Sequence, residues 1–554
     1  MRLLLKISIL IQLGPFMSSM AVAQGWQWSR HFGGPGHDYG QIGAVDAAGN
    51  VYCIGHYAGS GPGTYHNLYI GEDTLLGTEA GFLVKYNSSG TLMWSMNIAC
   101  TNANFAASVN SLVLDTASNA LIITGGHSSA CTIGTVALPD SGAYLAKVDL
   151  DGTCFWATNI GTVQTAGLGL VLNEVGELYV SGGVFQGGTS YIGNESILPG
   201  SFLAKFAADG AQLWAKSLIP GTTSAGYPRN LPYTLQCHSG LVYVYGPCFG
   251  SANGDLITID TITVAVTQGV TVLAGLNELS GIAEWVQTFG EANNGTYGYD
   301  NSMGLSNEGS IYCMGYIYSD TAYFGTDTAV VAPPNGLSYL VKYSASGELL
   351  HLHTYERVGS GGIHVTDDGS LLLIGNAIST PTMLDACDVG QGLFVMRMDS
   401  LGNCINMIGT GYATGTSILQ TPQGIYLAAS SIPQGGTTTF AGESVTSYGF
   451  EDVLLAKLDL ALGVQSLVLD GNDALHIYAN PNQGSFQVQV PDALVNAPHL
   501  DLKIYDATGR LVLAQSIGSG DEHPQFDLYG IGAGFYAVTL SNGQRVYHGN
   551  MVVE

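Results

Sequence analysis

The sequence predicts an all-β protein: a propeller-like array of about seven repeats, followed by a small β-sandwich. Two observations predict the array. One segment recurs along the chain, and each copy of it carries short strands separated by turns. Composition agrees, since 46% of the residues are hydrophobic, only 10% are charged, and 77 are Gly. A disordered chain would be poor in apolar residues and rich in charge. Abundant Gly with many Tyr and Val suits strands joined by tight turns.

The recurring segment is clearest at residues 81–95, GFLVKYNSSGTLMWS, where a strand with a Lys, a turn and a strand with a Trp follow one another. Copies lie at residues 81–95, 143–157, 201–215, 271–286, 338–352, 393–407 and 453–467. The cation of the repeat is Lys85, Lys147, Lys205, Lys342, Arg397 or Lys457. The fourth copy has Gly275 there. A period of about 55–70 residues is typical of propellers. Seven copies predict seven blades, and the degenerate fourth copy leaves six or eight as alternatives.

Each copy is preceded by two more strands, as at residues 42–45 and 51–55, so a unit has four strands. A Gly/Thr-rich excursion before the Lys strand reads as an added hairpin, for example at residues 70–75. Both faces of residues 82–86 are apolar, which predicts a sheet covered on both sides. The Lys is expected to lie along that surface with its amino group at the rim, in a structural role.

A lone strand at residues 25–32 resembles the last part of a repeat with no first part before it. We expect it to pair with the strands of the final repeat. Such pairing would close a ring and remove the exposed edges of an open array.

The start of the chain has the features of a secretory signal peptide, assigned to residues 1–23. Arg2 and Lys6 precede an apolar run at residues 7–17, and small residues lead to a predicted cleavage between Ala23 and Gln24. No later stretch reaches about 18 uninterrupted apolar residues, so no membrane span is expected.

The formal net charge of −27 argues against nucleic acid or an anionic membrane surface as partner.

Nine Cys leave at least one outside any disulfide. Two local disulfides are possible, Cys237–Cys248 and Cys387–Cys404. Buried thiols that behave as small hydrophobic groups are the alternative.

The repeat pattern stops after residue 467, where the composition becomes polar, so residues 24–467 are assigned to the propeller and 468–476 to a linker. Residues 477–554 alternate apolar and polar residues between Gly/Asn turns, which predicts a β-sandwich. Three motifs stand in this segment: YxNPxxG, IYDxxGR and GxYxVxL. Their residues are Tyr478, Asn480, Pro481, Gly484, Tyr505, Asp506, Gly509, Arg510, Gly534 and Tyr536.

The repeat pattern and the three C-terminal motifs each resemble a known protein family. The DxxGNVYxxG…FLVKYxxSGxxxW pattern resembles the SBBP-type β-propeller repeats of secreted Bacteroidetes proteins. The three C-terminal motifs resemble the type A C-terminal sorting domain of the type IX secretion system, although Ala479 replaces a frequent Pro and the last segment lacks the usual Lys. The second resemblance implies export through the outer membrane, the secretion machinery as partner, and a secreted or cell-surface location.

Candidate chemistry is sparse, and we assign no catalytic or metal-binding residue. His351 and His353 share a strand face with Glu356 and His364 nearby in sequence, a pattern that metal ligands also use. Residues 149–152 (DLDG) begin like a calcium loop, but the later ligands are missing, so a turn fits better. Calcium on an acidic excursion loop stays possible for an extracellular protein, and no other cofactor is expected. No GxSxG, HExxH or phosphate-binding loop stands in a convincing context.

The sequence therefore predicts a monomeric binding or adhesion module for glycan or protein, rather than an enzyme. Ligands are expected at the loop face near the ring axis, where Tyr, Trp and Asn side chains of several blades would converge. Two alternatives remain: a polysaccharide hydrolase or lyase that uses carboxylates at that face, and a purely structural surface or matrix protein.

Overall fold

The computed structural model describes residues 25–58, 66–77, 79–100, 107–162, 164–185, 190–221, 230–249, 255–266, 269–291, 296–297, 302–317, 321–325, 327–330, 337–356, 358–377, 382–384, 387–389, 391–430, 436–459, 475–491, 494–495, 499–506, 511–518, 523–528, 532–541 and 546–553. The predicted signal peptide, its cleavage site at Ala23 and Gln24, and most of the predicted linker lie outside these residues. The chain divides into two compact units, Met1–Leu462 and Gly463–Glu554. No helix in the described part of the chain has the length and hydrophobicity to cross a membrane.

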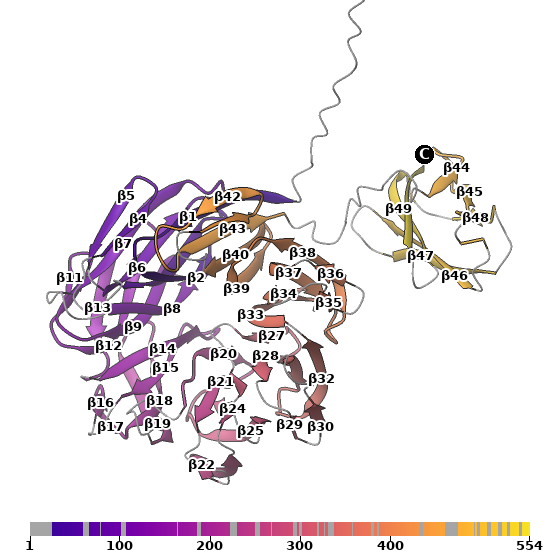
Figure 1. The fold of residues 1–554 in the computed structure, drawn as a ribbon. Coiled ribbons are helices and arrows are strands. Elements are labelled where there is room, and N and C mark those ends of the chain that lie inside the picture. The colour runs from indigo at the N-terminus through magenta and orange to yellow at the C-terminus, as the bar shows by residue number, and fades with distance from the viewer. Residues whose placement is uncertain are drawn as a thin grey trace, which may run out of the picture. The chain divides into compact units, whose positions relative to one another are not determined.

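In the part of the first unit that the structure describes, seven antiparallel sheets of at least four strands follow one another along the chain (Figure 1). The first three have the strands β2 (His37–Val45), β3 (Val51–Ala58), β6 (Glu79–Tyr86) and β7 (Leu92–Cys100); β8 (Ala107–Asp115), β9 (Ala120–His127), β12 (Gly142–Asp149) and β13 (Cys154–Asn159); and β14 (Thr165–Leu172), β15 (Leu178–Val184), β18 (Gly200–Phe206) and β19 (Gln212–Pro220).

The fourth to seventh sheets repeat this order. Their strands are β20 (Thr234–His238), β21 (Leu241–Phe249), β24 (Gly269–Asn277) and β25 (Ala283–Glu291); β26 (Thr296–Tyr297) and β27 (Met303–Leu305), both on β28 (Ile311–Ile317), then β31 (Leu337–Tyr343) and β32 (Leu349–Glu356); β33 (Val358–Val365), β34 (Leu371–Ala377), β37 (Gly392–Met398) and β38 (Cys404–Thr410); and β39 (Thr414–Thr421), β40 (Gly424–Ser430), β43 (Val453–Leu458) and β1 (Trp26–Phe32).

A short hairpin stands between the second and third strands of every sheet, as the excursions predicted. The hairpins are β4 (His66–Ile70) with β5 (Asp73–Gly77), β10 (Cys131–Ile133) with β11 (Val136–Leu138), β16 (Ser190–Ile192) with β17 (Glu195–Ile197), β22 (Asp255–Ile259) with β23 (Ile262–Val266), β29 (Thr321–Phe324) with β30 (Asp327–Val330), β35 (Thr382–Leu384) with β36 (Cys387–Val389), and β41 (Thr437–Phe440) with β42 (Glu443–Thr446). Strands β10 and β29 pair with the outer strands β7 and β25 of the preceding sheets, so these hairpins cover edges that would otherwise be open.

The arrangement of the sheets is propeller-like. Their inner strands contact one another in the order β2, β8, β14, β20, β27, β33 and β39, and β39 contacts β2. The strand predicted at residues 25–32 is β1, and it pairs antiparallel with β43, with Trp28 opposite Lys457 and Phe32 opposite Val453. The N-terminal strand therefore completes the last sheet, as the sequence predicted.

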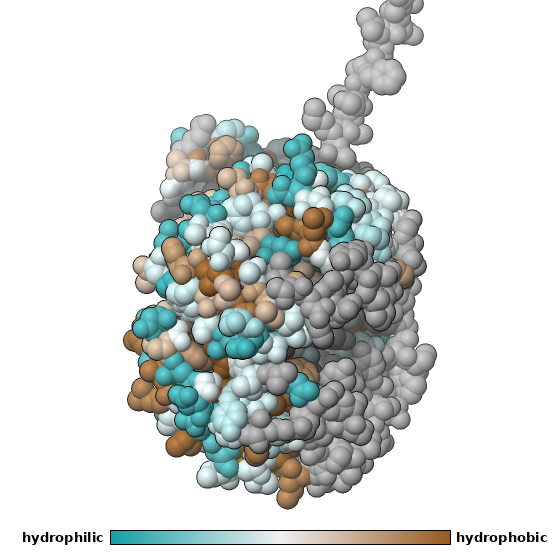
Figure 2. Space-filling view, turned by 90° about the vertical axis from the view of Figure 1, so that its left-hand side faces the viewer, coloured by the Kyte–Doolittle hydropathy of each residue, from teal (hydrophilic) through white to brown (hydrophobic). Residues whose placement is uncertain are grey.

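Neighbouring sheets pack face to face. Ile54 and Leu83 of the first sheet share one buried cluster with Ile123 and Tyr144 of the second. Side chains on both faces of a sheet are thus covered, as the apolar strand patterns predicted. Figure 2 shows the side of the molecule that lies on the left in Figure 1, where hydrophobic and hydrophilic residues are interspersed. Phe155 and Leu198 are among the exposed apolar side chains of the first unit.

The Lys and Trp of the repeat join several of the sheets to their neighbours. Lys85 Nζ and Trp94 Nε1 both donate to the carbonyl oxygen of Leu150, in the turn of the next sheet, at 2.7 and 3.1 Å. The ammonium group also lies 5.4 Å from the ring centre of Tyr52. Trp28, Trp214 and Trp285 make the same indole bond to Ser88, Leu279 and Ala345. The structural role predicted for the Lys is confirmed.

Two departures from the repeat have local reasons. Gly275 replaces the Lys because the Trp285 ring occupies its space: a Cβ on Gly275 would lie 2.5 Å from the indole. In the sixth sheet Arg397 bonds to Asp368 of its own sheet, and Asn406 stands opposite it in place of a Trp. In the seventh sheet the outer strand is β1, which comes from the other end of the chain, so no hairpin turn joins it to β43 in the way that Leu150 lies between β12 and β13.

Two disulfides tie outer strands to hairpins, Cys100–Cys131 and Cys387–Cys404. The second is one of the two predicted possibilities. The other possibility is wrong, because Cys237 and Cys248 are not disulfide-bonded. Cys237 stands opposite Val242 on β21, and Cys248 lies six residues farther along that strand. A separation of about 20 Å along a strand is far beyond disulfide reach.

The second unit is built from two sheets. These are β44 (His476–Tyr478), β45 (Ser485–Gln489) and β48 (Gln525–Asp527), and β47 (Leu511–Gly518), β46 (His499–Asp506), β49 (Gly534–Ser541) and β50 (Val546–Val553). Their apolar faces share one buried cluster, which includes Phe486, Val488, Ile504 and Val538.

Candidate binding site

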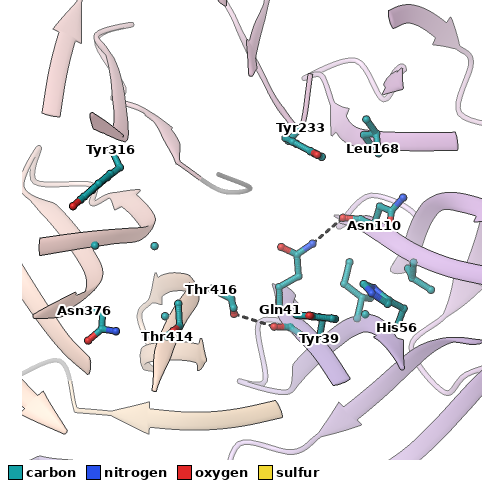
Figure 3. Close-up of a pocket in the computed structure, with 17 residues that line it drawn as sticks. Tyr39, Gln41, His56, Asn110, Leu168, Tyr233, Tyr316, Asn376, Thr414 and Thr416 are labelled. Carbon is teal, nitrogen blue, oxygen red and sulfur yellow. Dashed lines mark hydrogen bonds between the residues drawn. The ribbon is translucent and has the colours of Figure 1, made fainter. Parts of the chain in front are cut away.

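A cavity of about 680 Å³ lies where the inner strands of the seven sheets meet (Figure 3). All seven sheets, or the segments directly beside their strands, contribute to its wall. The lining residues are Tyr39, Gly40, Gln41, Ile54, Gly55, His56, Val109, Asn110, Leu168, Tyr233, Tyr316, Gly359, Gly361, Asn376, Thr414, Gly415 and Thr416.

β-bulges in the inner strands aim side chains at this cavity. The pairing register shifts at Asn110 in β8, at Leu168 in β14 and at Thr416 in β39, and each of these residues lines the cavity. A bulge puts an extra residue into one strand and redirects its side chain. These three repeats thereby each contribute an inward side chain that the strand's alternation alone would not place there.

Glycines allow the backbones to come close at the wall. A Cβ on Gly55 would lie 1.9 Å from the carbonyl oxygen of Tyr39, and a Cβ on Gly40 would lie 2.6 Å from Val453. Any larger residue at these positions would push β2 away from β3 or from the last sheet.

A belt of hydrogen bonds runs along part of the wall, each sheet donating to the next. Thr416 Oγ1 donates to Gly40 O at 2.9 Å, Gln41 Nε2 donates to Asn110 O at 2.7 Å, and Asn110 Nδ2 donates to Gly167 O at 2.7 Å. The first two bonds are drawn in Figure 3. These bonds fix the side chains and satisfy carbonyl groups at the inner strand edges.

Two titratable groups, Tyr39 and His56, lie on the wall beside the junction of the first and last sheets. Burial and a hydrogen bond to Glu451 raise the pKa of Tyr39 to about 12, so the phenol stays neutral. Burial lowers the pKa of His56, which the Glu451 charge partly opposes. The rings of Tyr39 and His56 lie 5.0 Å apart.

No Asp, Glu, Lys or Arg stands among the lining residues that the structure describes. This is notable in a chain whose net charge is −27. The wall offers hydroxyl, amide, imidazole and aromatic groups, which suit recognition of polar but uncharged molecules rather than charge pairing.

The sequence predicted that Tyr, Trp and Asn side chains would converge on a ligand site near the ring axis. This prediction was right for Tyr and Asn and wrong for Trp. Tyr39, Tyr233, Tyr316, Asn110 and Asn376 line the cavity, but no described Trp does. Four of the six indoles, those of Trp28, Trp94, Trp214 and Trp285, bond instead to carbonyl groups in the turns of neighbouring sheets. The individual lining residues could not be identified from the sequence, because their placement depends on bulges. The available signal for a lining residue was a polar residue inside an apolar inner strand, such as Asn110.

The histidine pair does not form a recognisable metal site. His351 and His353 lie on β32 with ring centres 6.3 Å apart, whereas His364 belongs to β33 of the next sheet. Within the described residues, no three His, Cys, Asp or Glu side chains are placed to hold a metal ion.

The DLDG segment at residues 149–152 forms the predicted turn. Asp149 Oδ1 accepts bonds from the backbone N–H groups of Asp151 and Thr153, at 2.9 and 2.7 Å. The carboxylate is thus used inside the turn.

The first C-terminal motif holds the ends of the second unit together. Asn480 Oδ1 accepts from Val552 N at 2.8 Å, and its Nδ2 donates to Asn550 O at 2.7 Å. Tyr478 ends β44 with an exposed ring, and Pro481 follows Asn480 in the turn. Gly484, at φ +95°, leaves room for the carbonyl oxygen of Leu528, which a Cβ would approach to 2.7 Å.

The other two motifs lie on adjacent strands. Tyr505 and Asp506 end β46, opposite Ala537 and Tyr536 of β49, which Gly534 begins. Tyr536 is nearly buried and its hydroxyl donates to Gly532 O at 2.7 Å. Gly509 and Arg510 lie outside the described residues.

Comparison with known families identifies this second unit. Residues 476–554 match the family described as secretion system C-terminal sorting domain. The match confirms the predicted sorting domain. A tail of this kind indicates a secreted or cell-surface protein that the type IX secretion machinery exports across the outer membrane.

The chain also has remote likenesses among solved structures. No curated protein matches the chain. Among solved structures, the Dos1 propeller has 10% identity and a TM-score of 0.37, covering 78% of this chain and 96% of its own. A DUF4221-family protein from Bacteroides vulgatus has 8% identity and a TM-score of 0.24, covering 63% and 93%. A glycoside hydrolase family 32 protein from Bifidobacterium adolescentis has 10% identity and a TM-score of 0.22, covering 96% and 94%.

Proposed function

We propose that this chain is a secreted or cell-surface binding module, formed by a closed seven-bladed propeller of SBBP-type repeats that acts as a monomer and binds an extracellular glycan or protein at its axis. The sorting domain delivers it, and the propeller does the binding. Residues 1–23 serve as the signal peptide for the first export step, with cleavage between Ala23 and Gln24. The sorting domain supports the export route, and the cavity described above supports the binding function.

The central cavity is the observation that carries the proposal. Its volume of about 680 Å³ is within the range of small-ligand sites, and side chains from sheets far apart in sequence converge on it. The hydrogen-bond belt holds several of those side chains in place before any ligand arrives, which lowers the entropic cost of binding. The order of sheet contacts, with β39 against β2, supports a closed ring of seven blades.

The hydrolase or lyase alternative requires carboxylates facing the substrate. No Asp or Glu is among the described residues that line the cavity, so no observation favours that alternative.

Calorimetric and thermal-shift titration of the complete mature chain tests the proposal. The probes are neutral and anionic oligosaccharides, a library of short peptides, and surface proteins of cells that live beside the producing bacterium. We expect at least one probe to bind with an affinity that falls at least tenfold in Tyr39→Ala and in Asn376→Ala. Tyr191→Ala is the matched control, because Tyr191 is exposed on the outer hairpin β16. Binding that survives both cavity substitutions would contradict a function at the axis.

A further inference from the structure

We infer that the central cavity takes the end of a neutral oligosaccharide, seated at the junction of the first and last sheets against a Tyr39 side chain that Glu451 holds in place. This inference rests on the proposed function and narrows it to one class of ligand and one side of the cavity. It also assigns Glu451 as a positioning residue.

The charge distribution points to a neutral ligand. The whole chain carries a formal net charge of −27, which disfavours association with anionic polysaccharides. A cationic ligand would be attracted to the protein, but the described cavity wall offers no carboxylate to neutralise its charge after desolvation. A ligand without formal charge avoids both penalties.

The hydrogen-bonding groups favour a polyhydroxyl ligand over an extended peptide. A peptide strand would bind by pairing with free backbone groups at an inner strand edge. Part of that edge is already occupied: Gly40 O and Asn110 O accept side-chain bonds, and Ile42 N donates to Ser417 Oγ at 2.8 Å. The wall instead presents Thr, Asn and Tyr groups, most of which both donate and accept, as sugar hydroxyls do.

The lining residues of the cavity are not spread evenly among the seven sheets. The first, sixth and seventh sheets supply most of its lining residues, including His56, Asn376 and Thr414. A ligand inside it therefore contacts mainly the junction at which the N-terminal and C-terminal strands of the propeller meet.

Tyr39 is the residue at this junction best suited to contact a sugar ring. Its side chain lines the cavity and 39% of its surface is exposed, so a ligand can reach it without displacing a neighbour. An aromatic side chain provides a large rigid contact area with few rotatable bonds to immobilise.

Glu451 fixes Tyr39 from the last sheet. Its carboxylate accepts a hydrogen bond from the Tyr39 phenol and lies 3.0 Å from His37 Nδ1. The His37 ring in turn stacks on Phe450 at 4.8 Å. The backbones are also joined, since Asp38 N donates to Glu451 O at 2.8 Å. The orientation of Tyr39 thus depends on contact between the first and last sheets.

Titration calorimetry of the complete mature chain provides the test. The neutral probes are cellohexaose, xylohexaose, mannohexaose, laminarihexaose and chitohexaose; hexagalacturonate is the anionic probe, and a neutral hexapeptide is the peptide probe. We expect at least one neutral hexaose to bind, Tyr39→Ala to weaken it at least tenfold, and Tyr39→Phe to weaken it severalfold. Tyr191→Ala should leave the affinity unchanged.

Glu451→Gln separates a positioning role from a general structural one. If Glu451 acts through the Tyr39 hydroxyl, its substitution should weaken binding severalfold in the natural background and have almost no further effect in Tyr39→Phe. Equal losses in both backgrounds would overturn the positioning role. Thermal midpoints of all variants verify that they are folded.

The remaining outcomes separate this inference from the proposed function. Cavity-dependent binding of the peptide or of hexagalacturonate alone would leave a binding module and overturn the neutral-glycan assignment. Binding of none of the neutral probes, or neutral binding that both Tyr39 variants leave intact, would overturn it as well.

Discussion

Lys85 and Trp94 donate to one shared acceptor, the carbonyl oxygen of Leu150 in the neighbouring sheet. Two donors on one carbonyl give the junction redundancy, because either bond alone keeps the acceptor satisfied. A shared acceptor recurs at Ser88 O, to which Lys457 Nζ and Trp28 Nε1 donate at 3.4 and 3.0 Å. Lys205 and Trp214 instead reach two adjacent carbonyls, those of Glu278 and Leu279.

The shared acceptor predicts non-additive substitution effects. Lys85→Met and Trp94→Phe should each destabilise the propeller by about 1 kcal/mol, because one donor remains. The double variant should lose about 1–3 kcal/mol more than the sum of the two, because Leu150 O then has neither donor. Urea titration followed by Trp fluorescence measures this coupling, and simple additivity would show that the two bonds are independent.

Alanine substitutions at Gly347 and Gly240 distinguish the free-energy cost of backbone strain from that of a steric clash. Both have positive φ, +79° and +83°, but a Cβ on Gly347 would lie 2.6 Å from the Trp285 ring, whereas one on Gly240 meets nothing within 4 Å. Gly240→Ala should cost about 1 kcal/mol from the backbone alone. Gly347→Ala should cost about 1–3 kcal/mol more from overpacking. Equal changes in thermal midpoint would mean that the indole moves freely.

The disulfide Cys100–Cys131 joins the outer strand of the first sheet to the hairpin of the second. Removing it by Cys100→Ser with Cys131→Ser should destabilise this junction by about 3 kcal/mol, because a 31-residue separation is no longer constrained in the unfolded chain. Thermal unfolding with and without reductant measures the effect. The reductant should lower the midpoint of the natural chain more than that of the double variant, which keeps only the Cys387–Cys404 bridge.

Stability should fall in mild acid partly because of His364. Burial lowers its pKa to about 4 in the folded protein, against about 6.5 when exposed. Above pH 6.5 the group is neutral in both states, so its effect is absent. Between pH 6.5 and 4 the unfolded chain binds a proton that the folded chain does not, and stability decreases as the pH falls. His364→Gln should flatten this part of a plot of midpoint against pH; an unchanged slope would contradict the assignment.

The periodic and local features of this fold were predictable from sequence. The strand of residues 81–86, the turn after it and the Trp strand recur with little change, so their pairing in one sheet could be read directly. The strand at residues 25–32 could be assigned to the last repeat because it carries the Trp half of the pattern alone. The sorting domain was identifiable from motifs that stand close together in the chain.

The cavity and one disulfide were not predictable, for a shared reason. Cys100 meets Cys131 across two sheets, and Asn110, Thr416 and Tyr233 line one cavity because strands of different sheets pack side by side. No spacing in the sequence encodes such relations. The bulges add a second obstacle, since they depart from the alternation by which a strand's inward residues are read.

The pairing of β1 with β43 has a consequence for how the molecule assembles. Trp28 must find Lys457 across almost the whole propeller sequence. Loop-closure entropy grows only with the logarithm of length, so this separation costs little stability, but pairings so distant in sequence form slowly. Until β1 arrives, β43 presents an open edge to its surroundings. An open strand edge is a template for pairing with another chain, so β43 is the place where two chains folding side by side can exchange their first strands.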